Sequence, residues 1–491
     1  MSEMINDRGA FPVPVPEGEP VSELYEVTVN GEKARLYEAR VSAMPLNRPW
    51  PGQERPIEQT EMAAILLMEM TSPAEITVTA GSEINDISVR PLSKGVKAET
   101  DGRTARFVIA EPGQYSVEIN GRHHNLHIFA DRPEGERAEA GDYTYYFAPG
   151  VHEAGDIRLN SGESVYIAPG AVVHGAIQAY DAHDIHIAGR GILDYSKMGR
   201  HDPLRWEEDG LINIARCSNV VIEGIVLRDS SWWTITSFNS VNLEYRGLKS
   251  VGMWRYNSDG FDFVNCQNVH VDGCFLRNFD DVLVIKGLRV KAYSDGYNNA
   301  KDVPPYELMS NRNFLIENCV VWCDWGGALE MGAETVADEY CNIVYRSCDI
   351  IHVSDGAMRI QSGDRAVIHN VLYDDIRVEY SKYDRQSVFQ HTDDTKYAPP
   401  DEYHVSPVIT GWMYCNKWTN DGIYGNIYDI TYRDIRVFTD EGMPEPKIVF
   451  RSVDDEHKFD RITIERFSVN GEPRRPVPEI SEFTLDIRVT D

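Results

Sequence analysis

The sequence predicts an all-β protein in which a small N-terminal β-sandwich precedes a right-handed parallel β-helix, a solenoid of stacked coils. Residues from about 20 to 130 alternate polar and apolar side chains between hairpin-type turns. From Tyr143 onward a strand–corner–strand unit recurs at irregular intervals, and apolar positions of separate units align in columns. At 491 residues the chain is too long for one ordinary globular domain, but it suits an elongated repeat.

The predicted sandwich strands come first in the chain. YEVTV (25–29), EITVTA (75–80), TARFVIA (104–110) and QYSVEI (114–119) have strand patterns, and VNGE and INGR supply turns. The stretch 131–142, DRPEGERAEAGD, is polar and carries Pro and Gly, which predicts a linker. We therefore expect a β-sandwich domain over residues 1–138 and a β-helix domain over residues 139–491, with the functional site in the second.

The coils of the β-helix are predicted from the repeated unit. NVVIEGIVLRDS begins at Asn219, and NVHVDGCFLRNF, NFLIENCVVWCD and NIVYRSCDIIHV repeat its pattern further on. Aligning these units places Cys274, Cys319 and Cys348 at one equivalent position. Small buried side chains stacked along a solenoid explain these residues without any chemistry, so we expect reduced thiols rather than disulfides or a zinc site.

Composition excludes several function classes. The 48 Lys and Arg residues face 78 Asp and Glu, a net charge of −30, which repels nucleic acid and anionic membrane surfaces. No apolar run is long enough to cross a membrane, and the first residues have no signal-peptide pattern, which predicts a cytoplasmic protein. The three histidines in RHHNLH (122–127) fall on mixed strand faces, so no metal or other cofactor is predicted. The oligomeric state stays open, a homo-oligomer included.

Four later strands share one frame and carry charged residues on one face. GFDFVN, VLVIKG, ALEMGA and AMRIQS align so that Phe261, Leu283, Leu329 and Met358 form an inward column. Strand alternation then turns Asp262, Val284, Glu330 and Arg359 outward. A further outward column is predicted to hold Val264, Lys286, Gly332 and Gln361.

In this frame Asp259 and Asp281 occupy equivalent positions on neighbouring coils, with Asp280 beside them. Neighbouring rungs lie roughly 4.8 Å apart, so three carboxyl groups are expected to crowd one small patch. Crowded like charges raise at least one pKa, leaving one group protonated and another ionised. An inverting glycosidase needs this pair, one acid to protonate the glycosidic oxygen and one base to activate a water.

NSDGFDF, NFDDVLVIKG, WGGALEMG and GAMRIQSG together resemble the catalytic strip of glycoside hydrolase family 28, the polygalacturonases. That family carries Asn-Thr-Asp-Gly, Gly-Asp-Asp, Gly-His-Gly and Arg-Ile-Lys in this order on a β-helix. The resemblance spans roughly residues 143–377, and a sandwich before the helix is also similar to family 49, the dextranase-like enzymes. It implies that Asp280 is the general acid, that Asp259 and Asp281 hold and deprotonate the water, and that Arg359 binds substrate.

The chain departs from the family pattern where the family grips uronate carboxylates. Gly327 stands at the His position, Gln361 at the Lys position, and Glu330 occupies the outward column beside Arg359. These changes and the net charge of −30 favour neutral sugars over uronates, although a uronate-directed exo-galacturonosidase is the alternative. A cytoplasmic enzyme would meet short imported oligosaccharides, which favours exo-action.

Further residues are expected around the three acids. Trp233 and Trp325 are the preferred aromatic residues for stacking against a sugar ring. The predicted substrate-binding set is completed by Asn257, Lys286, Glu330, Arg359 and Gln361. The polar insertion 289–312 follows the second acid motif directly and is expected to wall the pocket.

Two other function classes fit the pattern. A β-helix lyase or uronate epimerase needs Ca²⁺ or a basic catalytic residue, and this strip has more acid than base. A non-catalytic sugar-binding solenoid, such as an adhesin, has little use for a confined acid triplet. An inverting hydrolase that acts on oligosaccharides is the leading hypothesis.

Overall fold

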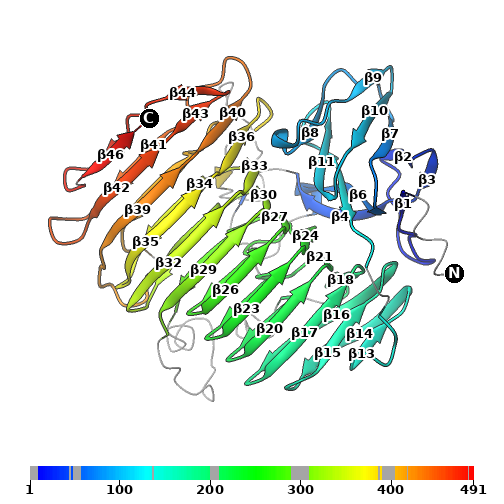
Figure 1. Cartoon of the computed structure of the whole chain (residues 1–491), viewed down its shortest axis with the longest axis horizontal. Helices are drawn as coiled ribbons and strands as arrows, with labels where there is room; N and C mark the ends of the chain where they lie inside the picture. Colours follow the sequence, from blue (N-terminus) through cyan, green and yellow to red (C-terminus); the bar gives the residue numbers. More distant parts are fainter. Residues whose placement is uncertain are drawn as a thin grey trace.

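The computed structural model describes residues 9–43, 46–47, 57–134, 138–198, 210–288, 309–384, 388–389, 404–416, 418–484 and 486–490 (Figure 1). Over these ranges the chain is all-β, with two 3₁₀ turns, η3 (Ile57–Gln59) and η4 (Leu92–Lys94), and no α-helix. The predicted fold class is confirmed: an N-terminal sandwich followed by a right-handed parallel β-helix. Within these residues no helix has the length and apolar character needed to span a membrane.

The N-terminal unit consists of two sheets whose inner faces share one hydrophobic core. The first sheet has six strands: β1 (Ala10–Pro12), β4 (Tyr37–Ser42), β6 (Thr60–Met70), β8 (Ile87–Arg90), β11 (Gly113–Ile119) and β12 (Leu126–Asp131). The second has five: β2 (Tyr25–Val29), β3 (Glu32–Ala34), β7 (Ala74–Ala80), β9 (Glu99–Asp101) and β10 (Thr104–Ile109). Alternate residues such as Ile76, Phe107 and Val117 fill the space between the sheets.

The predicted linker joins this sandwich to the first coil. The sandwich ends at Asp131 with β12, and the first strand of the helix, β13, begins at Tyr145. The boundary predicted between residues 138 and 139 falls in this connection and stays a prediction. Outside both units, β5 (Leu46–Asn47) and β37 (Val388–Phe389) pair in parallel.

Each coil of the β-helix contributes one strand to each of three parallel faces. The first, which we call the ladder face, consists of β13 (Tyr145–Phe147), β15 (Ser164–Ile167), β17 (His183–Gly189), β20 (Ser218–Glu223), β23 (Val241–Arg246), β26 (Gln267–Asp272), β29 (Asn311–Glu317), β32 (Glu339–Arg346), β35 (Val367–Asp374), β39 (Ile427–Arg433), β42 (Phe459–Glu465) and β46 (Ile487–Thr490).

The second face, which we call the docking face, meets the sandwich. It consists of β14 (Gly150–Leu159), β16 (Ala171–Tyr180), β18 (Ile192–Asp194), β21 (Val226–Arg228), β24 (Lys249–Val251), β27 (Phe275–Asn278), β30 (Val320–Cys323), β33 (Asp349–Val353), β36 (Arg377–Tyr380), β40 (Arg436–Thr439), β43 (Phe467–Val469) and β44 (Glu472–Arg474).

The third face, which we call the site face, consists of β19 (Ile212–Ala215), β22 (Ile235–Phe238), β25 (Phe261–Val264), β28 (Leu283–Gly287), β31 (Gly327–Thr335), β34 (Gly356–Ser362), β38 (Ile409–Met413), β41 (Ile448–Arg451) and β45 (Glu479–Ile480). The long strand β16 follows β14 and pairs with both β18 and β19, so the docking face and the site face diverge after it.

Asparagines at equivalent corners fix the register of the coils on the ladder face. Each adopts a left-handed backbone conformation, with φ between 54° and 60°, which Asn tolerates better than most residues. Their side-chain amides donate to one another from coil to coil at 2.5–3.0 Å. The ladder contains Asn219, Asn242, Asn268, Asn313, Asn342 and Asn370. Its period is the one that the repeats beginning at these asparagines predict.

The inside of the helix is filled by stacked columns of like residues. Tyr345, Tyr373 and Tyr432 stack with ring centroids 4.8 and 4.9 Å apart. The predicted cysteine column is confirmed, because strand pairing places Cys274, Cys319 and Cys348 at one position and all three thiols are buried and free.

The strand register predicted for the site face is confirmed, with one irregularity. Phe261, Leu283, Leu329 and Met358 pair in sequence and join the interior core, while Glu330 pairs with Arg359 on the outward side. A β-bulge follows, since Ile285 pairs with Met331 but Gly287 pairs with Thr335. The second outward column is therefore interrupted at Gly332, because β31 carries two extra residues between these pairs.

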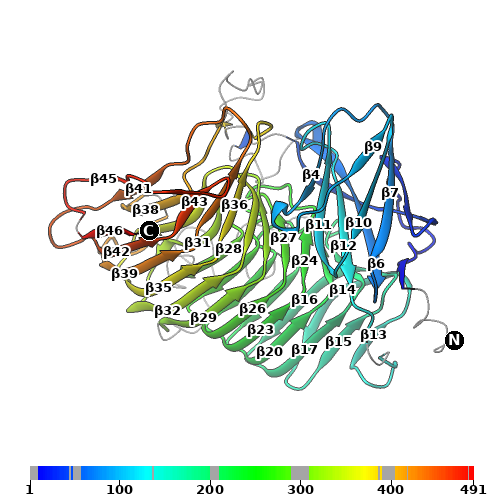
Figure 2. The same cartoon turned by 45° about the horizontal axis from the view of Figure 1, so that its top comes forward.

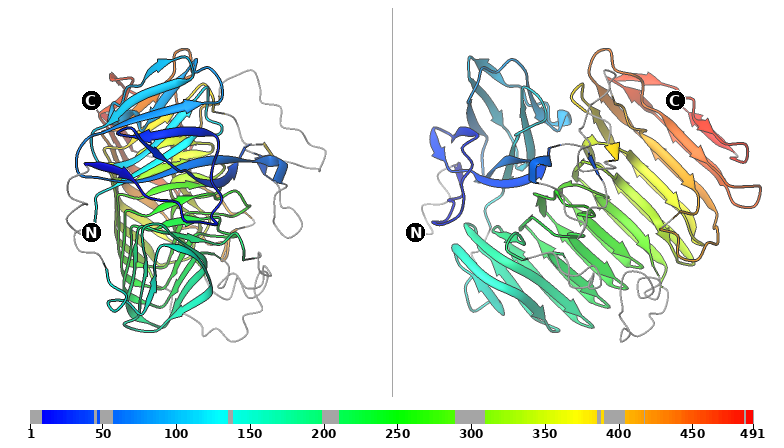
Figure 3. Two further views of the ribbon diagram at one scale, coloured as in Figure 1. Left: turned by 90° about the vertical axis from the view of Figure 1, so that its right-hand side faces the viewer. Right: turned by 180° about the vertical axis from the view of Figure 1, so that it is seen from behind.

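The sandwich packs along the docking face, as Figures 2 and 3 show from different sides. Apolar side chains of the sandwich, such as Ile65 and Phe129, form one cluster with outward-facing residues of the helix, such as Val226, Phe275 and Ile351. A second hydrophobic core therefore covers the outer side of the docking face where the sandwich lies on it, from β16 to β33, whereas strands at its two ends, such as β14 and β44, are partly or fully exposed.

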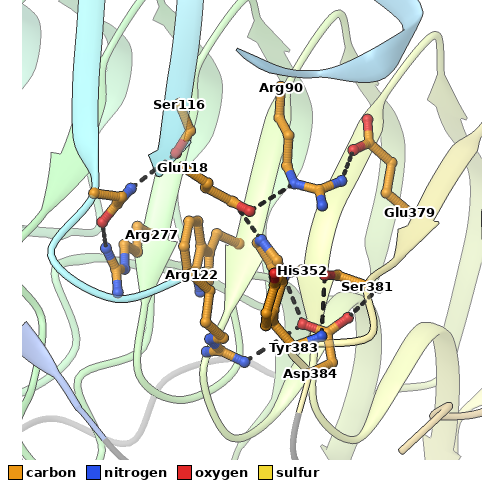
Figure 4. Close-up of polar contacts among 12 residues, drawn as sticks. Arg90, Ser116, Glu118, Arg122, Arg277, His352, Glu379, Ser381, Tyr383 and Asp384 are labelled. Atoms are coloured by element: carbon orange, nitrogen blue, oxygen red, sulfur yellow. Dashed lines mark hydrogen bonds and ion pairs between the residues drawn. The ribbon is translucent and has the colours of Figure 1, made fainter. Parts of the chain in front are cut away.

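A buried polar network lies beside this second core (Figure 4). His352 of β33 contacts Glu118 of the sandwich at 2.5 Å and Asp384 at 2.6 Å. Arg90 binds both Glu118, at 3.0 Å, and Glu379, at 2.5 Å. All five side chains are at least 95% buried, so the network depends on each ion keeping its partner.

The charges of this network predict how docking depends on pH. Burial lowers the pKa of His352, but Glu118 and Asp384 outweigh it, so the pKa is raised overall. Burial raises the pKa of Glu118, but Arg90 and His352 lower it to about 2. The His352 contribution is complete below ~6.5 and is lost as pH rises through the raised value, and the Glu118 contribution is complete above ~4.3 and is lost toward about pH 2.

We therefore expect His352→Gln to lower the melting temperature most between about pH 4.5 and 6.5, with the difference from the wild type shrinking above that range. Thermal unfolding across this pH series measures the effect. His152→Gln is the control, because His152 contacts a backbone carbonyl rather than an acid. A difference that stays constant with pH would contradict the assignment of a charged His352.

Candidate active site

A pocket of about 730 Å³ opens on the site face around the predicted acid cluster. Its walls come from the residues before β22, β25, β28 and β31, from the strands themselves, and from the segment around β38. All ten residues predicted for catalysis or substrate binding line it: Trp233, Asn257, Asp259, Asp280, Asp281, Lys286, Trp325, Glu330, Arg359 and Gln361. Residues 289–308, most of the insertion expected to wall the pocket, lie outside the described residues.

Parallel pairing brings the acids together. Asp259 and Asp281 each stand two residues before a strand, and β25 and β28 pair in the predicted register. Backbone bonds extend this pairing into the turns, since the Gly260 N–H donates to the Asp281 carbonyl at 2.8 Å. The Asp259 carbonyl accepts from the Asn278 amide at 2.9 Å and from the Thr234 hydroxyl at 2.7 Å. The turns that carry the acids are therefore fixed from three coils.

A glycine separates the wall of the pocket from the two neighbouring acids. A Cβ at Gly326 would lie 2.4 Å from Asp281 Oδ1 and 2.7 Å from Asp280 Oδ1, closer than a Cβ approaches such atoms. Only glycine fits here, and the two carboxyl oxygens lie on either side of this point. Gly-Gly before β31 is thus required by the acids that face it.

Asp281 is held in its ionised form. Its Oδ1 atom accepts from Arg359 Nη2 at 2.7 Å and from the Gly327 N–H at 3.0 Å. Burial opposes the charge, but Arg359 and Lys286 outweigh it and lower the pKa of Asp281 below its usual range.

Among the described residues no cation binds the carboxyl group of Asp280, and its pKa is shifted in the opposite direction. Its Oδ1 atom accepts the Asp281 N–H at 3.1 Å. Burial and the neighbouring carboxylates of Asp259 and Asp281 raise the pKa of Asp280 well above its usual range. A protonated carboxyl and an ionised carboxylate therefore lie next to each other in the chain and in the pocket, which is the arrangement that acid–base catalysis requires.

Asp259 binds the ammonium group of Lys286. Lys286 Nζ lies 2.8 Å from Asp259 Oδ2, 2.9 Å from Asp262 Oδ1 and 3.9 Å from Asp281 Oδ2. The same ammonium lies 4.1 Å from the ring centroid of Trp233. Burial raises the pKa of Asp259 to about 7, against the opposing effect of Lys286. Lys286 is thus surrounded by groups of the protein itself.

Arg359 is likewise bound by acids of the chain. Its Nη2 atom donates to Asp281 and, at 2.6 Å, to Glu330, while Nη1 donates to Asp355. A Cβ at Gly327 would lie 2.2 Å from Glu330 Oε2 and 2.9 Å from Arg359 Nε. Glu330 therefore occupies the space into which a larger side chain at position 327 would extend.

Two predicted aromatic residues contact the pocket differently. Trp233 is only 4% exposed, because Lys286 covers one part of its ring and it stacks near Phe238. Trp325 is half-buried and lies parallel to Phe279, with ring centroids 6.4 Å apart. Trp325 offers more ring surface to a sugar.

The sequence did not reveal the wall formed around β38. Tyr414 accepts a hydrogen bond from Gln361 at 2.8 Å, and further pocket residues from this segment and elsewhere are His404, Asn416, Trp418, Asn420, Tyr256, Glu334 and Asp355. The segment lies beyond the last motif and after an insertion that breaks the repeat. Its aromatic and amide content, YCNKWTN, was the only signal.

Among the residues that the structure describes, one His/Cys/Glu group has metal-ligand spacing. The ligand atoms of Glu339, Cys341 and His369 lie within 4.8 Å of one another on the ladder face. Glu339 already binds Arg312 at 2.5 Å and His369 at 3.0 Å, and burial raises the pKa of the Cys341 thiol to about 11. These contacts explain the group without an ion.

No protein-family model matches the sequence, and no curated protein sequence is significantly similar to it. Solved structures do share the fold. An exopolygalacturonase from Thermotoga maritima superimposes with a TM-score of 0.50 and 15% identity, over 70% of this chain and 83% of its own. Dex49A from Penicillium minioluteum gives a TM-score of 0.51 and 14% identity, over 95% of this chain and 92% of its own. At these identities the likeness shows the fold.

Proposed function

We propose that the protein is an inverting glycoside hydrolase that acts on oligosaccharides from a chain end. The observation that carries the proposal is that Asp280 and Asp281 lie side by side in one pocket lined by aromatic and amide side chains, where Arg359 and the Gly327 N–H bind Asp281 while burial raises the pKa of Asp280. That the fold is shared with an exopolygalacturonase supports the same activity class.

In this proposal Asp280 protonates the glycosidic oxygen as the bond to the anomeric carbon breaks. Asp281 and Asp259 accept the proton of the water that attacks that carbon. Arg359 and the Gly327 N–H hold Asp281 in one orientation, and Lys286 does the same for Asp259. Both acceptors are therefore positioned before substrate binds.

The distance between the acids bears on whether the anomeric configuration is inverted or retained. The carboxyl oxygens of Asp280 and Asp281 flank the Gly326 position at 2.7 and 2.4 Å, so they lie closer together than the ~6.5–9.5 Å typical of inverting enzymes. We assign inversion because Asp281 Oδ1 is occupied by Arg359 and Gly327, which leaves this oxygen a poor nucleophile.

The pocket disfavours the other two function classes. A lyase or epimerase needs a neutral base, and Asp259 and Asp262 raise the pKa of Lys286 well above its usual range despite its burial, so it stays charged. An adhesin has no use for a buried acid with a raised pKa, which costs stability.

The charges around Arg359 favour neutral sugars. A substrate carboxylate binds best to two adjacent N–H groups of one guanidinium. Both N–H groups of Nη2 already contact Asp281 and Glu330, and Nη1 contacts Asp355. The ionised Asp281 beside Arg359 would also repel a uronate. A uronate-directed exo-galacturonosidase is the alternative, and it requires Glu330 to leave Arg359.

Exo-action is supported by walls at both ends of the pocket along the helix axis. Trp232 and Trp233 stand before β22, and Tyr414 and Trp418 stand beside β38, several coils further on. A polymer running along the coils would meet aromatic side chains at each end, whereas a chain end fits between them.

Replacing each acid tests the assigned roles. Asp280→Asn, Asp281→Asn and Asp259→Asn should each reduce kcat by at least ~10²-fold on any cleaved oligosaccharide. Asp280→Asn should be no less stable than the wild type, because it removes a group whose charge burial opposes. The control is Asp272→Asn, on the ladder face, which should keep normal turnover. An acid variant that retains normal turnover loses its catalytic role.

The anomeric configuration of the first product tests direct water attack. Proton NMR recorded early in the reaction should show inversion, because no glycosyl-enzyme bond forms in the proposed mechanism. Retention, or a glycosyl-enzyme trapped on Asp259 or Asp281, would overturn the proposed mechanism and leave a retaining hydrolase.

Matched substrates test the preference for neutral sugars. Neutral and uronic α-linked di- and trisaccharides should differ by at least ~10-fold in kcat/KM in favour of the neutral member, because Arg359 has no free pair of donors. Measurement at low and high salt separates the charge effect, since salt should raise the uronate rate more. Cleavage confined to oligogalacturonides would reverse the substrate assignment and keep the hydrolase.

A further inference from the structure

Two charged residues at the base of the acid cluster, Asp262 and Lys286, have no direct part in the proposed bond cleavage. Asp262 stands on β25, one position along the outward column from Val284, and is fully buried. It does not line the pocket, and neither of its carboxyl oxygens has a hydrogen bond of good geometry within the described residues. Its one close cation is Lys286, at 2.9 Å from Oδ1.

Lys286 is shared between Asp262 below and Asp259 above. The two contacts are nearly equal, 2.9 and 2.8 Å, and the Lys286 side chain is 4% exposed. Trp233 covers it at 4.1 Å from the ring centroid. A lysine in this position cannot reach a sugar in the pocket without breaking contacts with two acids. It acts on the reaction through the acids that it binds.

We propose that Lys286 and Asp262 are positioning residues that together set the charge of Asp259, with Lys286 favouring its ionised form and Asp262 competing for the same ammonium. This inference rests on the proposed hydrolase activity only for its consequence in catalysis. The electrostatic relation among the three side chains is independent of what the pocket cleaves.

The other charges near this pair come from three further elements. Asp281 lies 3.9 Å from Lys286 Nζ, at the turn before β28. Glu334 of β31 adds negative charge on the same side, and Asp280 and Arg359 complete the set. Four acids therefore face Lys286 directly or nearly so, and a single ammonium cannot keep all of them ionised.

The sharing makes the acids titrate together. Burial raises the pKa of Asp262 well above its usual range and raises that of Asp259 to about 7. Because both carboxyls bind the same ammonium, Asp259 and Asp262 titrate as a coupled pair. The charge on Asp259 therefore depends on Lys286 remaining charged beside it and on how strongly Asp262 binds the same ammonium.

Opposite shifts are expected from the two substitutions. Lys286→Met removes the one cation that the described residues place within 3 Å of Asp259, so the pKa of Asp259 should rise by at least about one unit. Asp262→Asn keeps the shape and removes the competitor, so the pKa of Asp259 should fall, by about one unit. Lys286→Arg retains the charge and should return the value toward that of the wild type.

Carbon-13 NMR of protein labelled at the aspartate carboxyl carbon measures these shifts without any substrate. The Asp259 resonance is identified by its loss in Asp259→Asn. The matched controls are Lys249→Met and Asp349→Asn, which remove a buried lysine and a buried aspartate from ion pairs on the docking face. Neither control should move the Asp259 titration.

The pH profile of kcat/KM tests the consequence of these shifts for catalysis. Its acidic limb should move up with Lys286→Met and down with Asp262→Asn, in step with the NMR values. If no oligosaccharide is cleaved by any variant, the proposed function fails while the NMR titration still decides this inference. Shifts of equal sign in the two variants, or no shift in folded Asp262→Asn, would overturn it.

Discussion

The acids in and beneath the pocket outnumber the cations that pair with them, and this imbalance determines the chemistry of the site. Within the described residues Asp259 and Asp262 share Lys286, Asp281 and Glu330 share Arg359, and Asp280 has no salt bridge to either cation. Each cation holds the acid that its geometry favours, and the remaining carboxyls must keep a proton because burial opposes their charge. The protonated Asp280 and the ionised Asp281 both result from this single constraint, since Arg359 reaches one of them and not the other.

The solenoid makes such crowding stable. Parallel strands stack at roughly 4.8 Å, so equivalent positions on successive coils are held at that spacing by backbone bonds far from the site. The asparagine ladder and the tyrosine column fix the same register on the ladder face and in the interior. Repulsion between Asp259 and Asp281 therefore cannot push the two turns apart, and it appears as altered pKa values instead.

The sequence was sufficient to predict the strand register wherever the repeat was regular. The column from Phe261 to Met358 and the meeting of Asp259 with Asp281 follow from strand alternation and a fixed offset, and pairing confirms both. The bulge at Gly332 was not predicted, because two extra residues do not change the polar–apolar alternation of the strand. The pocket wall around Trp418 was not predicted, because it follows an insertion and the repeat no longer indicates where each residue lies on a coil.

The sequence could not predict how deeply each outward-facing side chain is buried. Lys286 was predicted to bind substrate because it faces outward on the right strand, and it does border the pocket. Its contacts with Asp259, Asp262 and Trp233 become visible only when the neighbouring coils are present. Trp322 is a second case, since an outward tryptophan on a β-helix is buried here under Arg277 by the docked sandwich.

The docked sandwich also bears on the pocket, because the two sites use the ends of the same strands. Sandwich Arg122 binds Asp324 at 2.8 Å, and the next residue is Trp325 of the pocket wall. Sandwich Glu118 binds His352, two residues before Ser354, whose hydroxyl donates to the Asp324 carbonyl at 2.9 Å. Asp355 then contacts Arg359. A series of contacts and adjoining backbone segments thus runs from the sandwich to the cation that holds Asp281, ending at Asp355, whose side chain is 48% exposed, so the N-terminal unit is part of the framework that orients the acids.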